Sequence, residues 1–143
     1  MSNFKVSDME KLFRIPKGDR CVTNQVPYSL DDRGIEGDLL PWCERHGIPV
    51  MAYSPLGGPG ANLLKDPTLA SIAASHGCSA AAVALGWTIR GSNVFAIPES
   101  GSVTHVKENA EAFSLTLTPQ ELQTLDAAHP PPGLLSRLLH LLR

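Results

Sequence analysis

Polar and aromatic side chains recur where the apolar runs of this chain end. Ser2-Asn3 open the chain, Gln25 lies in the run 21–26, Tyr53-Ser54 end the run 48–53, and Pro98 to Ser100 follow the run 93–97. Amide and hydroxyl groups donate and accept hydrogen bonds, and a tyrosine ring can stack on another ring. A helix that begins near Val103 offers backbone amides to a phosphate. Together these residue types suit a flat, polar, aromatic ligand that carries phosphate.

Strands and helices alternate between these positions. We predict strands over residues 21–26, 48–53 and 93–97 with a stub at 2–4, and helices over 34–46, 67–76, 79–90 and 103–112. Capping boxes at residues 7–10 and 118–121 predict two more helix starts. Alternating strands and helices indicate parallel βα units, whose functional residues lie where the strands end.

The length of the chain limits its architecture. A complete eight-stranded α/β barrel takes about 250 residues, whereas this chain has 143. We therefore predict an α/β fold that is a partial (half) TIM barrel of parallel βα units, over residues 1–132. The proline run 130–132 precedes a leucine-rich helix, so that residues 133–143 form a separate C-terminal helical segment.

Four motifs resemble the second half of an aldo-keto reductase barrel, and that of bacterial methylglyoxal or aldehyde reductases in particular. They are Ser2-Asn3-Phe4, Asn24-Gln25, Tyr53-Ser54-Pro55-Leu56 and Ile97-Pro98-Glu99-Ser100. The resemblance implies an oxidoreductase fold with a nicotinamide cofactor, NADP or NAD. It implies these cofactor-binding residues: Ser2, Asn3, Gln25, Tyr53, Ser54, Leu56, Ile97, Glu99, Ser100, His105, Glu108 and Asn109.

The same resemblance assigns roles within this set. It implies that Ser2, Asn3 and Gln25 hold the nicotinamide carboxamide, and that Tyr53 stacks on the nicotinamide ring. Ser54 and Leu56 would contact the pyrophosphate, and the segment 97–109 would bind the adenosine phosphate. Without the resemblance, Tyr53 is interpreted as a packing residue of the barrel rim.

Two positions depart from the family pattern. The family commonly has lysine at the position of Glu99 and arginine at that of His105, cations that hold the 2′-phosphate of NADP. A carboxylate repels this phosphate, and a mostly neutral imidazole is a poor replacement for a cation. We therefore expect weak dinucleotide binding without a strong preference for NADP.

The resemblance also indicates which chemistry is missing. The catalytic aspartate, tyrosine, lysine and histidine of the family belong to the first half of the barrel, and Tyr28 matches no catalytic motif. Carbonyl reduction needs a positioned general acid. We expect no catalytic residue in this chain and no carbonyl reductase activity from the chain alone.

Two alternatives remain open. The first is an active NAD(P)H-dependent oxidoreductase that uses a partner chain or non-standard catalytic residues. The second is a non-catalytic, self-associating structural module.

Composition limits the kinds of binding partner and the cellular compartment that we expect for this chain. A net charge of −2 gives no attraction to nucleic acid or to an anionic membrane, and no apolar run reaches the roughly 18 residues of a membrane span. No signal peptide is visible. Three widely spaced cysteines, Cys21, Cys43 and Cys78, predict buried free thiols in a reducing compartment rather than a metal site. We therefore expect a cytoplasmic protein.

Half a barrel leaves two strand edges and one sheet face open. We expect a second copy of the chain to cover them, which makes the protein a dimer. The residues expected on the open, inward face are Val22, Val26, Val50, Ala52, Val94 and Ala96.

Overall fold

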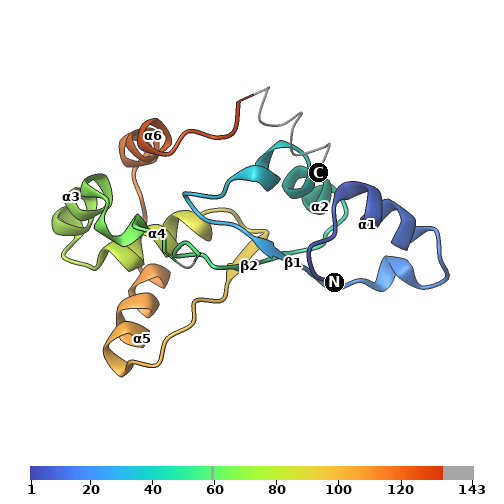
Figure 1. The fold of residues 1–143 in the computed structure, drawn as a ribbon, viewed down its shortest axis with the longest axis horizontal. Helices are drawn as coiled ribbons and strands as arrows, with labels where there is room; N and C mark the ends of the chain where they lie inside the picture. Colours follow the sequence, from blue (N-terminus) through green and yellow to red (C-terminus); the bar gives the residue numbers. More distant parts are fainter. Residues whose placement is uncertain (59, 134–143) are drawn as a thin grey trace.

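The computed structural model describes residues 1–58 and 60–133. Its sheet has three parallel strands in the order β1 (Asn24–Pro27), β2 (Val50–Tyr53) and β3 (Val94–Ala96). A parallel bridge between Ser2 and Gln25 places the amino-terminal stub beside β1. The prediction of parallel βα units is confirmed, and the sheet crosses the middle of the molecule (Figure 1).

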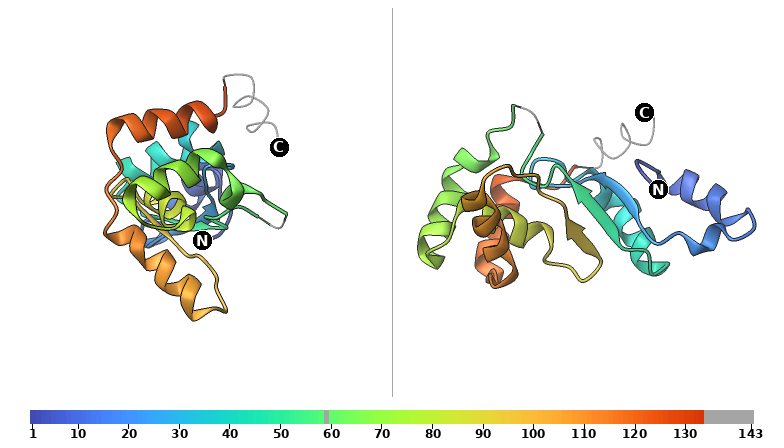
Figure 2. Two further views of the ribbon diagram at one scale, coloured as in Figure 1. Left: turned by 90° about the vertical axis from the view of Figure 1, so that its left-hand side faces the viewer. Right: turned by 90° about the horizontal axis from the view of Figure 1, so that it is seen from below.

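Helices lie at both ends of this sheet. The α-helices are α1 (Val6–Phe13), α2 (Leu39–Arg45), α3 (Pro67–His76), α4 (Ala80–Thr88), α5 (Val103–Ala110) and α6 (Pro119–Ala128). Short 3-10 helices are η1 (Gly18–Arg20), η2 (Gly34–Gly37), η3 (Leu63–Lys65) and η4 (Glu111–Phe113). Figure 2 shows α1 and α2 at one end of the molecule and α3, α5 and α6 at the other. The predicted helix 134–142 lies outside the described residues.

Local capping explains why several helices form where the sequence predicts them. The Asp66 carboxylate accepts the first free amides of α3, and Gly77 ends this helix with a φ of 64°. Ser79 caps α4 by accepting a hydrogen bond from an amide three residues on. At the start of α6 the capping box of Thr118 and Glu121 is present as predicted.

Two predicted elements are wrong in detail. The helix α1 is not capped by a box at residues 7–10, because it begins after Lys5, whose amide donates to the Asp8 carboxylate at 3.2 Å. The predicted helix 34–46 is divided into η2 and α2, with Asp38 between them at a φ of −147°. Glycines at both ends of η2 favour this break, since glycine is a poor residue for a helix interior.

The core consists of two clusters of buried side chains. The larger cluster surrounds α4, in which every residue from Ala81 to Thr88 is buried, and contains Trp87 and Leu69. The smaller cluster joins α1 and α2 to the first two strands and contains Met9, Trp42 and Val50. Helix α4 therefore forms the centre of the larger half of the molecule.

The helices cover the sheet face that we expected to be open. Val26, Val50 and Ala52 are buried against the helices, with exposed fractions of 2%, 0% and 0%. The register places Gln25, Met51 and Phe95 in one row on the opposite face, and none of them is buried. The predicted set of inward-facing residues is therefore wrong, because both faces carry apolar side chains and alternation alone does not tell them apart.

Among the described residues no single helix is long and apolar enough to cross a membrane. Helices α3 and α4 reach that length and hydrophobicity only as a pair, bent by 97°. Within residues 1–58 and 60–133, no three histidine, cysteine, aspartate or glutamate side chains are grouped so that they could hold a metal ion.

Candidate cofactor site

Three of the predicted residues meet where the amino-terminal stub pairs in parallel with β1. Ser2 pairs with Gln25 in the parallel bridge, and the Asn3 amide donates to the Gln25 carbonyl at 2.8 Å. The Gln25 amide in turn donates to the Met1 carbonyl at 2.9 Å. These backbone bonds place Ser2 and Asn3 directly beside Gln25.

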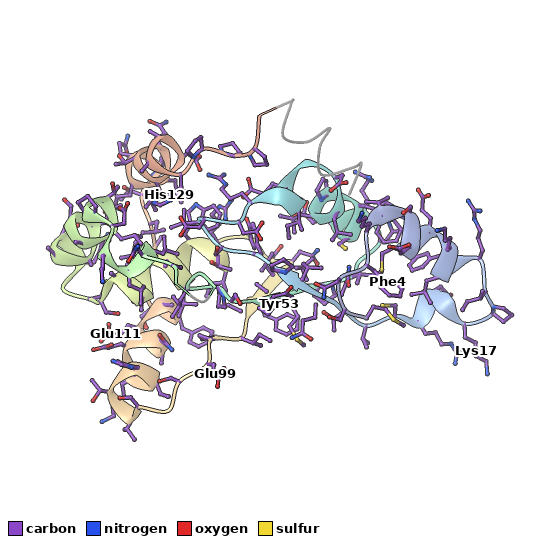
Figure 3. The ribbon with its side chains drawn as sticks, viewed as in Figure 1. Phe4, Lys17, Tyr53, Glu99, Glu111 and His129 are labelled. Carbon is purple, nitrogen blue, oxygen red and sulfur yellow. The ribbon has the colours of Figure 1, made fainter. Side chains whose placement is uncertain are left out.

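Tyr53 joins this group from the end of β2. Its hydroxyl donates to the Asn3 side-chain oxygen at 3.1 Å, although fifty residues separate the two in the chain. Figure 3 shows Tyr53 near the middle of the molecule, beside the sheet. The structure thus brings together Asn3, Gln25 and Tyr53.

Asn24, the neighbour of Gln25, has a structural role that the sequence did not assign to it. Its side chain is fully buried, donates to the Phe4 carbonyl at 2.8 Å and accepts from the Phe4 amide at 3.4 Å. This amide holds the stub against β1. The only signal in the sequence was an amide side chain in an otherwise apolar run.

The backbone at this site adopts an unusual conformation. Asn3 and Ser54 have φ angles of 57° and 49°, in the left-handed region that residues other than glycine rarely occupy. Such conformations cost about 1–3 kcal/mol and are common at functional sites. At Ser54 the left-handed turn ends β2 and leaves the side chain exposed, directly after Tyr53.

The side chain of Leu56 packs inward rather than toward the open end of the strands. It is half-buried against the larger core cluster, which contains Leu63 and Leu69. The predicted contact of Leu56 with a pyrophosphate stays a prediction.

The segment predicted to bind the adenosine phosphate continues from β3 into α5. The Ile97 amide donates to the Ala52 carbonyl at 3.0 Å, which anchors its first residue to the sheet. The Ser102 amide donates to the Ser100 hydroxyl at 3.1 Å, and the Ser102 hydroxyl caps α5. Ser102 was missed by the sequence reasoning, although a serine before a helix is a strong cap signal.

The charged and polar residues of this segment are exposed or half-exposed. Glu99 and His105 are exposed, whereas Glu108 and Asn109 on α5 are partly buried. Lys107 is the only lysine or arginine between residues 97 and 109. In the described part of the chain no hydrogen bond or ion pair links these residues to Tyr53, and Figure 3 shows Glu99 on the loop that leads to α5.

A buried charge network supports the loop after β1. Arg33 has a side chain only 5% exposed and donates to Glu36 at 2.9 Å, to Asp126 at 2.7 Å and to the His129 carbonyl at 2.6 Å. It therefore ties this loop to α6. Arg33 and Asp126 are 93 residues apart, and no pattern in the sequence indicated that they are in contact.

Glu36 is the common acceptor within this network. It accepts from Tyr28 at 2.7 Å and from Arg90 at 3.1 Å, besides Arg33. Burial opposes its ionisation, but the hydrogen bonds from Arg33, Tyr28 and Arg90 outweigh burial and hold the pKa of the Glu36 carboxyl below its usual value. Burial is also the main cause of the raised pKa of the Tyr28 hydroxyl. Both side chains are therefore held in place within this network.

Comparison with known proteins gives this arrangement a family. Residues 1–130 match the aldo/keto reductase family. The chain is 46% identical over 135 residues to methylglyoxal reductase YeaE of Escherichia coli, an alignment that covers 92% of this chain and 48% of that protein. It is 32% identical over 127 residues to an uncharacterized oxidoreductase, YtbE, of Bacillus subtilis, covering 89% of this chain and 43% of that protein.

Solved structures agree with the sequence comparison. An aldo/keto reductase from Klebsiella pneumoniae in complex with NADP and acetate has a TM-score of 0.88 and 44% identity, over 92% of this chain and 48% of that one. A second, in complex with NADPH, has a TM-score of 0.89 and 43% identity, over 95% and 49%. The chain spans about half the length of the relatives that it matches, so its fold is a partial α/β barrel, and it belongs to the aldo/keto reductase family.

Proposed function

We propose that this chain supplies the dinucleotide-binding half of an aldo/keto reductase and has no carbonyl reductase activity by itself. The observation that carries the proposal is the hydrogen bond between Tyr53 and Asn3 beside Gln25. This bond holds the Tyr53 ring against the Asn3 side chain, and Gln25 is the backbone neighbour of Asn3. The relatives solved with NADP and NADPH support a nicotinamide ligand.

The residues present suit such a ligand. Ser2, Asn3 and Gln25 carry donors and acceptors for a carboxamide, and the Tyr53 ring can stack on a nicotinamide. The exposed Ser54 would meet the pyrophosphate. At the start of α5 the amides that the Ser102 cap leaves free would face the adenosine phosphate.

A bound nicotinamide would supply hydride, but a general acid is also required. The chain has two tyrosines. Tyr28 is buried and donates to Glu36, and Tyr53 donates to Asn3. Neither hydroxyl is free to protonate a substrate oxygen, which supports the proposed lack of activity.

The charges near α5 support weak binding without selectivity for NADP. In this proposal Glu99 would face the 2′-phosphate with a carboxylate, which repels it, and a histidine at position 105 would replace an arginine. We accordingly propose a weak site that accepts NADPH and NADH about equally.

The state of the cysteines bears on the cellular compartment of the protein. Cys21, Cys43 and Cys78 are free thiols, and burial raises the pKa of Cys43 to about 11, which keeps it protonated. Free thiols suit a reducing compartment. We therefore propose a cytoplasmic protein.

The test is a titration with NADPH and with NADH, followed by the fluorescence of the reduced nicotinamide. We expect weak saturable binding that Tyr53→Ala reduces about tenfold, a change of about 1.4 kcal/mol. Tyr53→Phe keeps the ring and should lose less. Ser92→Ala, on an exposed turn before β3, is the matched control. Equal binding by the wild type and Tyr53→Ala would contradict the proposed site.

A second assay tests the proposed lack of activity. Loss of a general acid alone lowers rates by about 10²–10⁴-fold, so the purified chain should not oxidise NADPH measurably with methylglyoxal. Turnover that survives repurification and disappears in Tyr53→Phe would favour the alternative, an oxidoreductase with a non-standard acid.

A further inference from the structure

The exposed apolar side chains of the described residues are concentrated near the two ends of the sheet. On the amino-terminal side lie Met1 and Val22, beside the first strand positions, and Ile15, in the loop after α1, with exposed fractions of 49%, 81% and 56%. At the β3 end lie Phe95, Ile97, Val103, Val106 and Phe113, with exposed fractions of 39%, 39%, 75%, 53% and 86%. Leu64 is the one large apolar residue of this exposed group that lies elsewhere in the described ranges. Exposed apolar side chains that gather in one patch mark interaction surfaces, whereas single ones do not.

The β3 end is also hollowed. A cavity of about 480 Å³ opens between β3, α4 and α5 and is lined mainly by apolar residues, among them Leu85, Ile89 and Ala110. Val106 and Phe113 also line it, and both are largely exposed. Beyond β3 the described residues provide no further strand, so its outer backbone edge is open.

The opposite edge of the sheet is formed by the amino-terminal stub rather than by a full strand. The last strand position there is the bridge at Ser2, beside β1, and the described residues place no strand outside it. The amino-terminal edge and the β3 edge run parallel, because every pairing in the sheet is parallel. Each edge can therefore extend the other as a parallel neighbour.

We propose that two copies of this chain close one barrel, with the β3 edge of each copy paired to the amino-terminal edge of the other. A closed barrel of this family of folds has eight strands. The stub and β1 to β3 supply four positions, which is half of the circle, so a second copy turned by half a circle closes it. This interface goes beyond the proposed cofactor function of a single chain.

This geometry explains why both ends are apolar. Each of the two junctions brings Met1, Ile15 and Val22 of one copy toward the Val106 and Phe113 side of the other. A twofold axis along the barrel makes the two junctions identical and leaves no edge open. The row of Gln25, Met51 and Phe95 then faces the barrel interior in both copies.

The experiment measures mass by light scattering and analytical ultracentrifugation over a dilution series. The wild-type chain should have twice its 15.3 kDa mass at micromolar concentration. The double variants Ile15→Glu/Val22→Glu and Val106→Glu/Phe113→Glu should each weaken dimerisation by about tenfold or more. Leu64→Glu, a matched change of an exposed leucine away from both ends, should not. Circular dichroism checks that each variant is folded.

Mixing the two double variants distinguishes this pairing from others. In the mixed dimer one junction combines both altered surfaces, and the other junction is unaltered. The mixture should therefore recover a dimer that neither variant forms alone. A wild-type chain that is strictly monomeric at micromolar concentration overturns the proposal, and so does a dimer that one double variant leaves intact. So does a monomer that pairs only with the separately produced amino-terminal half of methylglyoxal reductase YeaE.

Discussion

Replacing Glu36 by glutamine removes the negative charge at the centre of the network that joins the β1 loop, α4 and α6. In the wild type this carboxylate accepts from Tyr28, Arg33 and Arg90, and its side chain is only 14% exposed. Removing one partner of a buried ion pair costs about 3–5 kcal/mol. The amide oxygen still accepts hydrogen bonds and Arg33 keeps Asp126, so we expect a smaller loss, about 2–4 kcal/mol.

The assay is thermal and urea unfolding at several pH values. For a domain of this size the loss corresponds to a fall in Tm of about 10 °C at pH 7. The pKa of Glu36 is lowered in the folded chain from its ordinary value of 4.5. Its ionised form therefore stabilises the folded chain fully above pH 4.5, and this stabilisation is lost as the pH falls through the lowered value. The difference between wild type and Glu36→Gln should shrink accordingly.

Glu44→Gln is the control, because it removes the same charge from an exposed position on α2. It should change Tm by no more than about 2 °C, as exposed charges contribute little. The reasoning is refuted if Glu36→Gln is no more destabilising than Glu44→Gln at pH 7. It is also refuted if the difference between wild type and Glu36→Gln persists unchanged in acid.

Two further predictions concern the cofactor site. Glu99→Lys should raise affinity for NADPH over NADH by about tenfold, since a cation replaces a carboxylate opposite the 2′-phosphate; an unchanged ratio in parallel titrations places Glu99 elsewhere. Asn24→Ala should cost about 1–3 kcal/mol in urea unfolding, because it removes the buried clamp on Phe4. The same change should weaken NADPH binding by displacing Asn3, whereas Thr116→Ala, on an exposed loop, should do neither.

Helices whose first residue is marked by a capping side chain were predictable from the sequence. Helices α3, α4 and α6 begin at Asp66, Ser79 and Thr118, whose side chains satisfy the free amides of the first turn. The helix predicted over residues 34–46 failed at Asp38, where flanking glycines weaken the helical preference. Strand β1 begins at Asn24 rather than at residue 21, because only the residues from Asn24 onward pair with β2.

The candidate site was predictable in part for a similar reason. Asn3, which lies beside Gln25, meets Tyr53 because neighbouring parallel strands bring their ends to one side of the sheet, which the alternating pattern already implied. The network of Arg33, Glu36 and Asp126 gave no signal, since its partners are far apart in sequence and charged residues are usually solvated. The open face of the sheet was assigned wrongly, because valine and alanine fit either side.

The two core clusters divide the molecule into two potential cooperative units. Ile35, Leu40 and Val94 pack against both clusters and form the seam between them. Apart from strand β2, which carries Val50 of the smaller cluster and Ala52 of the larger, few side chains join the two units. The amides of α1 should therefore exchange with solvent sooner than those of the fully buried α4. Asn3 precedes Phe4, which packs against the smaller cluster, and Tyr53 follows Ala52 of the larger one, so the hydrogen bond between them links the two units. A ligand that holds both residues would therefore couple the opening of one unit to the other, and slower exchange throughout α1 would report its binding.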